Sequence, residues 1–144
     1  MDEKIIEQLE LLNRYVLYLK EISTYPKERF LKDFLLIGST ERYLQSAIEA
    51  CINIGNRLLS LIQFKKPVSS PNTYKDIFLE LEKVGIIPQT FTNTMIKMVK
   101  FRNRIVHMYW EIEPEYLYEI ISKNLKDFKK FTAYIIDYIK REEI

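Results

Sequence analysis

The 144-residue sequence predicts an all-α fold, an antiparallel bundle of five to six helices. Apolar residues recur at three- and four-residue steps over most of the chain, which is the spacing of one buried helix face. Only 3 glycines and 5 prolines occur, too few for a turn-rich β fold, and no segment shows strand-like alternation. The apolar stretches are joined by short connections, which favour antiparallel neighbours.

The N-terminal half is expected to contain three helices. The first runs from Asp2 to about Ser23 and ends before Pro26, because the residue preceding a proline avoids the α conformation. Pro26 then opens a short second helix that extends to Phe34. The segment Gly38-Ser39-Thr40 is expected to break this helix and to cap a long third helix, which runs from about Thr40 to Phe64.

The C-terminal half is expected to contain three more helices. A loop rich in proline and serine, Lys65 to Asn72, leads into a short helix from Tyr74 to Val84. Pro88 opens the fifth helix, which extends to about Trp110. A last helix starts at Glu113-Pro114 and carries a continuous apolar face toward the C-terminus.

Size and composition favour one domain spanning residues 1–144 in a soluble, cytoplasmic protein. Cys51 is the only cysteine, which excludes an intramolecular disulfide and fits a reducing cytosol. The N-terminus lacks the apolar core of a signal peptide, and no apolar run is long enough to span a bilayer. With one histidine and one cysteine, a zinc site is essentially excluded. No glycine-rich phosphate loop occurs either, so no cofactor is expected.

The most informative segment is Phe101-Arg102-Asn103-Arg104-Ile105-Val106-His107-Met108-Tyr109-Trp110. It holds the only histidine, with an arginine five residues before it and a tyrosine two residues after it. Arginine offers a permanent cation with a planar donor fork that suits phosphate, and histidine can accept or donate a proton near neutral pH. The pair therefore suggests phosphodiester chemistry.

Helical geometry separates these side chains. Arg102 and His107 diverge by about 140° in an ideal helix, whereas Asn103 and His107 are neighbours on one face. We expect Arg102, Asn103 and His107 on a polar surface, and a core face behind it that includes Ile105 and Met108. One copy would form a loose site, but two copies packed through this surface would bring both pairs around one cleft.

Further residues are candidates for supporting roles. Arg104, Lys100 and Lys97 add positive charge to the same helix and could guide RNA through its phosphates, although an ordinary solvated face is the favoured explanation. Glu49 and Asn53 are four residues apart on the long helix and face one way. They either support the cleft or only join helices.

At these residues the sequence resembles the HEPN superfamily, and within it the HepT toxins of HepT–MntA pairs. The family motif is an arginine, four to six residues, and then a histidine, often with a polar residue after the arginine; Arg102, Asn103 and His107 match it. The HepT branch adds a tyrosine two residues after the histidine, which Tyr109 matches. The segments 41–57 and 74–87 also resemble the family, so the likeness covers nearly the whole chain.

The resemblance implies a helical homodimer with an active cleft at its interface. It also implies metal-independent endoribonuclease activity, with Arg102, His107 and Asn103 as catalytic residues, and an MntA-like nucleotidyltransferase antitoxin that adds AMP to Tyr109. Two alternatives remain. One is a non-catalytic HEPN module that binds a nucleotide or a partner enzyme, and the other is a helical interaction protein in which the motif only packs a dimer.

Overall fold

Seven α-helices and one short 3-10 helix make up the fold, and no strand is present, which confirms the predicted all-α class. The computed structural model describes all residues, 1–144. The elements are, in chain order, α1 (Glu3–Ser23), α2 (Lys27–Leu31), α3 (Phe34–Ile62), α4 (Tyr74–Lys83), α5 (Gln89–Met108), η1 (Tyr109–Glu111), α6 (Pro114–Lys123) and α7 (Lys126–Glu142).

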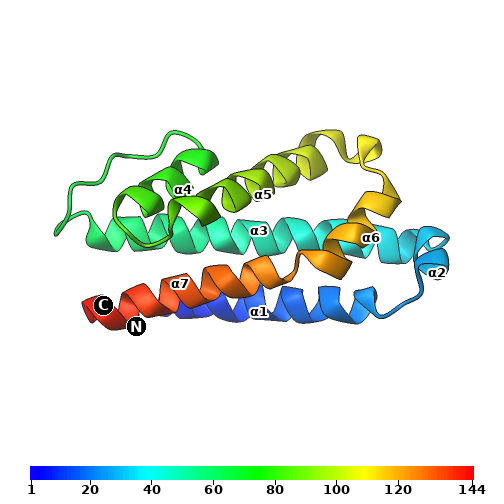
Figure 1. The fold of residues 1–144 in the computed structure, drawn as a ribbon, viewed down its shortest axis with the longest axis horizontal. Helices are drawn as coiled ribbons and strands as arrows, with labels where there is room; N and C mark the ends of the chain where they lie inside the picture. The colour runs from blue at the N-terminus through cyan, green and yellow to red at the C-terminus, as the bar shows by residue number, and fades with distance from the viewer.

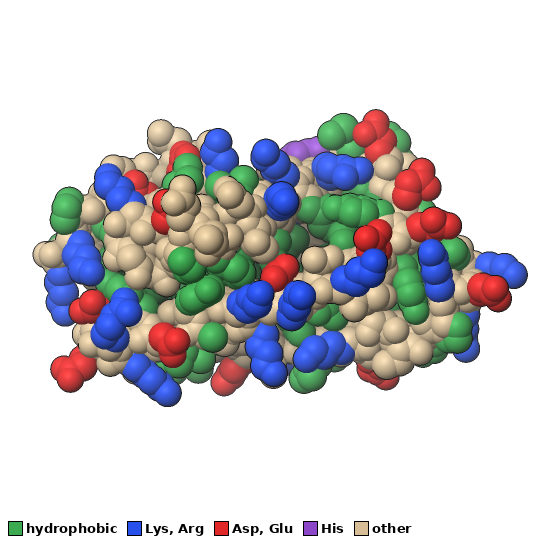
Figure 2. All heavy atoms as spheres, viewed as in Figure 1, with side chains coloured by type: hydrophobic (Ala, Val, Ile, Leu, Met, Phe, Trp, Pro, Cys, Tyr) green, Lys and Arg blue, Asp and Glu red, His purple; other side chains and the backbone are tan.

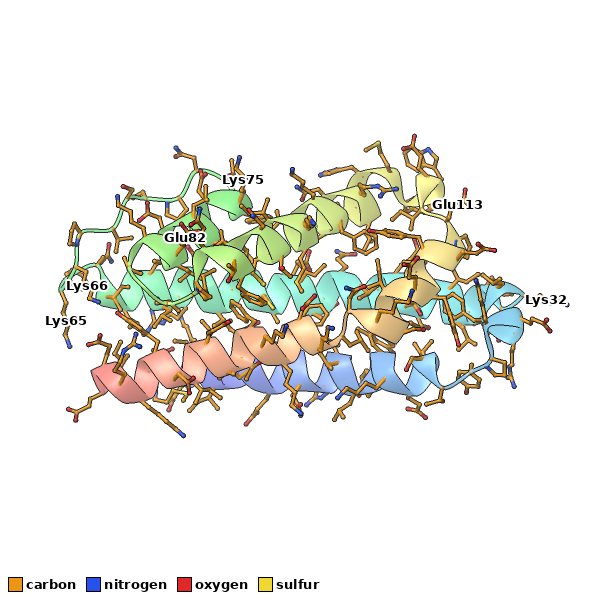
Figure 3. All side chains as sticks on the ribbon, viewed as in Figure 1. Lys32, Lys65, Lys66, Lys75, Glu82 and Glu113 are labelled. Carbon is orange, nitrogen blue, oxygen red and sulfur yellow. The ribbon has the colours of Figure 1, made fainter.

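The 29-residue helix α3 runs the length of the molecule and is the element against which the others pack (Figure 1). The antiparallel α1 forms the most extensive pairing with it. The hairpin of α4 and α5 covers another side of α3, and α6 and α7 close the bundle over α1 and α3. Lys65 and Lys66 mark the end of the molecule where α3 stops, and Lys32 marks the opposite end (Figure 3). This arrangement leaves the C-terminal half of α5 lying beside the middle of α3.

The long helix begins earlier than predicted. Asp33 caps α3, because its carboxylate accepts hydrogen bonds from the backbone N–H groups of Leu35 and Leu36 at 3.0 and 3.2 Å. Gly38 therefore lies inside the helix rather than in a break. Thr40 does not cap, since its hydroxyl donates to the Leu36 carbonyl at 2.7 Å, one turn back. The predicted break was wrong because a carboxylate cap outweighs the modest cost of one glycine in a helix.

The last predicted helix is in fact two. Asn124 is the C-cap of α6 (φ −113°, ψ −1°), and α7 starts two residues later. Asparagine is a poor helix former, because its side chain stabilises non-helical conformations. The change of direction lets Ile121 of α6 and Phe128 of α7 both reach the core.

The core is one continuous cluster of 35 buried apolar residues, drawn from every α-helix. Only two polar side chains, Thr40 and Thr92, are buried, and each donates its hydroxyl to a carbonyl one helical turn back. Outside the core, the Arg57 guanidinium ties α3 to the start of α1 through Asp2 at 2.8 Å and lowers the pKa of that carboxyl to about 2. Apolar packing therefore holds the bundle together, and the Arg57–Asp2 ion pair fixes the start of α1 against α3.

Two glycines of α3 should respond oppositely to substitution. A Cβ at Gly55 would lie 2.8 Å from Ile77 Cγ2 and 3.1 Å from Leu81 Cδ1, so Gly55 lets α4 approach closely. We expect Gly55→Val to lower the free energy of unfolding by about 1–3 kcal/mol through overpacking. A Cβ at Gly38 meets nothing within 4 Å, so Gly38→Ala should raise stability by up to about 1 kcal/mol. Urea unfolding followed by circular dichroism measures both, and a destabilised Gly38→Ala would contradict the continuous α3.

Candidate active site

Arg102 points into the seam between α5 and α3, where only 15% of its side chain is exposed. Its Nε and Nη2 donate to the same carboxylate oxygen, Glu49 Oε2, at 3.0 and 2.8 Å. Arg102 was predicted on a polar surface with the core behind it. Instead it faces α3, where the carboxylate of Glu49 holds it.

Three more side chains contact Arg102 or its partner Glu49. Gln45 donates from Nε2 to Glu49 Oε2 at 3.2 Å, one turn earlier on α3. The ring of Tyr74, at the start of α4, lies 5.1 Å from the guanidinium carbon, in cation–π contact. Asn103 Oδ1 accepts from Arg102 Nη1 at 3.1 Å. These contacts fix the plane of the guanidinium and use only part of its donor set, so N–H groups on Nη1 and Nη2 remain for an anion.

His107 lies on the solvent side of α5, away from this seam, and is exposed. Lys97, Lys100 and Arg104 share its side of the helix, because the steps of three, four and three residues between them follow one helical face. The two lysines are exposed, Arg104 is half-buried, and none of these side chains makes an ion pair. We define these four residues as the basic stripe. The stripe presents positive charge and an imidazole together to solvent.

Helix α5 ends before the tyrosine of the motif. Met108 leaves the helical conformation (φ −145°, ψ 43°), and Tyr109 and Trp110 lie in the 3-10 turn η1, not in α5 as predicted. The Tyr109 and Trp110 rings touch edge-on at 5.4 Å and are 61% and 69% exposed. Met108, predicted in the core, is 40% exposed, because the turn lifts it away from α3. The motif therefore ends in an exposed apolar and aromatic surface.

The supporting residues predicted from the sequence separate into two groups. Glu49 holds Arg102, whereas Asn53 donates to Gln8 Oε1 of α1 at 3.2 Å and joins two helices. Asn103 bonds Arg102 and makes no hydrogen bond to His107. Gln45 and Tyr74 were not predicted. The four-residue step from Gln45 to Glu49 could have revealed the first, but no local signal brings Tyr74 from α4 to Arg102.

Two other properties of the molecule bear on its chemistry. No group of three His, Cys, Asp or Glu side chains lies close enough together to hold a metal ion. None of the helices combines the length and the apolar character that crossing a bilayer requires.

Arg102, Asn103 and His107 lie on α5 of this helical bundle and Tyr109 lies in the turn that follows, which is the order of residues expected from the HEPN resemblance. The chain belongs to the ribonuclease HepT-like family, whose model matches residues 5–135. It is 30% identical to the mRNA nuclease HepT of Shewanella oneidensis over 142 residues, covering 99% of this chain and all of the relative. It is 31% identical to the tRNA nuclease HepT of Aphanizomenon flos-aquae over 136 residues, covering 94% and 90% of the two chains.

Solved structures show the same fold. The tri-AMPylated Shewanella oneidensis HEPN toxin in complex with an MNT antitoxin aligns with a TM-score of 0.85 and 28% identity, covering 95% of this chain and 99% of the toxin. A toxin–antitoxin crystal structure with AMP-PNP aligns with a TM-score of 0.83, 28% identity and coverage of 94% and 99%. The cytosolic protein YutE of Bacillus subtilis, 17% identical with a TM-score of 0.80 and coverage of 96% and 90%, shares the fold.

A double-mutant cycle should show that Glu49 and Arg102 act as a unit. We expect Glu49→Gln and Arg102→Met to couple by about 0.5–2 kcal/mol in the free energy of unfolding, because the pair is partly buried and shares two hydrogen bonds. The exposed pair Glu119–Lys123, 3.6 Å apart within α6, is the control and should couple by about 0.3–0.5 kcal/mol. Equal coupling in the two cycles would contradict the positioning role of Glu49.

Proposed function

We propose that this chain is a metal-independent endoribonuclease, the toxin of a toxin–antitoxin pair, and that it cuts RNA with Arg102, Asn103 and His107. The observation that carries the proposal is the oriented guanidinium of Arg102 on the same helix as the exposed imidazole of His107. The family and the relatives named mRNA and tRNA nuclease support the reaction class. An RNA substrate would also place the protein in the cytoplasm.

The proposed reaction uses the 2′-hydroxyl that RNA carries as its own nucleophile. His107 takes the proton of this hydroxyl, and its oxygen attacks the adjacent phosphorus. The bond from phosphorus to the 5′-oxygen breaks, and that oxygen takes a proton from a general acid. The products are a 2′,3′-cyclic phosphate and a 5′-hydroxyl. Arg102 donates to the phosphate oxygens and offsets the charge that grows on them, and Asn103 keeps the guanidinium facing them.

The general acid comes from a second copy of the chain in this proposal. Val106, Met108, Tyr109 and Trp110 are 38–69% exposed beside His107, and a contiguous exposed apolar surface of this kind marks an interface. A homodimer formed through these residues would set two histidines and two arginines around one cleft. One histidine would then act as the base and the other as the acid.

The proposed antitoxin is an MntA-like nucleotidyltransferase that adds AMP to Tyr109. Its hydroxyl makes no hydrogen bond within the chain, and the side chain is 61% exposed in a turn that an enzyme can reach. The related toxin of Shewanella oneidensis is tri-AMPylated in its complex with the antitoxin. Added phosphates beside the basic stripe would repel RNA and fill the cleft.

Replacing His107 by alanine tests the catalytic proposal. We expect the purified wild-type dimer to cleave RNA in the presence of EDTA and to leave 2′,3′-cyclic phosphate ends. His107→Ala should slow cleavage by about 10²–10⁴-fold, because it removes the proton transfer. Arg102→Lys should also be impaired, since an ammonium ion lacks the planar donor fork. Cleavage assays on end-labelled RNA measure both rates.

Arg14→Ala supplies the control, because Arg14 is an exposed arginine on α1 that makes no ion pair. It should cleave as the wild type does, and circular dichroism should show all variants folded. A folded, dimeric His107→Ala that cleaves RNA at the wild-type rate would refute the assignment. If the wild type binds a nucleotide or a partner enzyme but never cleaves RNA, the chain is the non-catalytic module.

Replacing Tyr109 by phenylalanine tests the modification. After incubation with ATP and the cognate nucleotidyltransferase, mass spectrometry should show the wild type heavier by one or more AMP units and no longer able to cleave RNA. Tyr109→Phe should keep its mass and its activity. Tyr18→Phe is the control, because Tyr18 is 40% exposed on α1 and should not affect modification. AMP found on a residue other than Tyr109 would overturn this assignment.

A further inference from the structure

A hollow of about 230 Å³ lies between the middle of α5 and the junction of α6 with α7. Figure 2 shows hydrophobic side chains at its floor and charged side chains at its edge. Phe101, the residue before Arg102, lines it together with Tyr116, and their rings meet nearly edge-on at 5.6 Å. The hollow lies where α6 ends at Asn124, because the axis of α7 runs in a different direction from that of α6.

The polar side chains that line this hollow have no partners in the protein. Thr94, Lys97, Asn124 and Asp127 form no side-chain hydrogen bond and no ion pair. Thr94 and Asp127 are half-buried, and Lys97 and Asn124 are exposed, so these polar groups are open to solvent and to a ligand. An apolar floor with a few unpaired polar groups is the composition of a small-ligand pocket. The hollow is smaller than the roughly 300–1,000 Å³ of sites for drug-sized molecules, so it suits a single ring system.

The hollow is continuous with the proposed path of the RNA. Lys97 lines it and also begins the basic stripe, which leads along α5 through Lys100 and Arg104 to His107. Lys97 and His107 are ten positions apart in the helix, a distance of about 15 Å along the axis. Phosphates that follow the stripe from His107 would therefore arrive at the rim of the hollow within a few nucleotides.

We propose that this hollow binds one unstacked nucleobase of the RNA strand, a guanine or a cytosine, and so sets the sequence preference of cleavage. The proposal rests on the ribonuclease function proposed above. Phe101 and Tyr116 supply the aromatic surface on which a base packs. Asp127 accepts from amino groups, and Lys97 donates to carbonyl oxygens. Guanine and cytosine carry both groups, whereas adenine lacks the carbonyl and uracil lacks the amino group.

Cleavage of a random-sequence RNA pool, followed by sequencing of the ends, tests the specificity. The wild type should favour guanine or cytosine at one position a few nucleotides from the cut. Asp127→Asn should weaken that preference by about fivefold or more, because the carboxylate acceptor becomes a mixed donor and acceptor. Asp137→Asn is the matched control, an exposed aspartate ten residues further along α7, and should keep the wild-type preference.

Binding of mononucleotides tests the pocket without cleavage. In nuclear magnetic resonance titrations up to about 10 mM, GMP or CMP should shift the signals of Thr94, Phe101 and Asn124 saturably and more strongly than AMP or UMP. Thr94→Phe, which fills the hollow, should abolish these shifts while the remaining spectrum stays folded. His107→Ala should keep them, because His107 lies outside the hollow.

The outcomes separate the two proposals. If GMP or CMP shifts these signals saturably but the protein cuts no RNA, the nucleobase pocket is supported. Only the ribonuclease proposal is then contradicted. The pocket proposal is overturned if no mononucleotide shifts these signals. It is also overturned if folded Asp127→Asn and Thr94→Phe variants cleave RNA with the wild-type base preference.

Discussion

The ion pair between Arg102 and Glu49 is the constraint on which the site depends. Two hydrogen bonds of 3.0 and 2.8 Å to one carboxylate oxygen fix a guanidinium that is 15% exposed. An unpaired arginine at this depth would cost free energy, so Glu49 both neutralises the charge and sets its direction. Because both residues lie within long, well-packed helices, the packing of the bundle holds the Arg102 guanidinium in position.

As a consequence, the two sides of α5 carry different functional groups. Its inner side carries the positioned guanidinium, and its outer side carries the basic stripe, which includes His107. Side chains that diverge by about 140° around one helix do not meet on the same substrate atom within one copy. The exposed apolar residues at the end of the motif supply the surface through which a second copy would complete the site. The proposed mechanism therefore depends both on where Arg102 and His107 lie on α5 and on the pairing of two copies of the chain.

Local patterns were enough to predict the helical class, most helix boundaries and the motif, because each depends on residues within a few positions of one another. The predictions failed where distant contacts decide. The start of α3 depends on the Asp33 cap, and the placement of Arg102 depends on a partner 53 residues earlier in the chain. Tyr74 is a similar case, since only the packing of α4 against α5 brings its ring to the guanidinium.

The composite nature of the site is tested most directly by mixing two inactive subunits. Arg102→Ala and His107→Ala chains, carrying different affinity tags, would be co-expressed, and the dimers holding both tags would be isolated. These mixed dimers keep one Arg102 and one His107 on opposite subunits, so the account predicts that RNA cleavage rises above that of either homodimer. It should stay below the wild-type rate, because only one of the two histidines that act as base and acid remains. Each homodimer alone should stay inactive. Mixed dimers that form as readily as wild-type dimers but cleave no faster than the inactive homodimers would contradict a site shared between two copies.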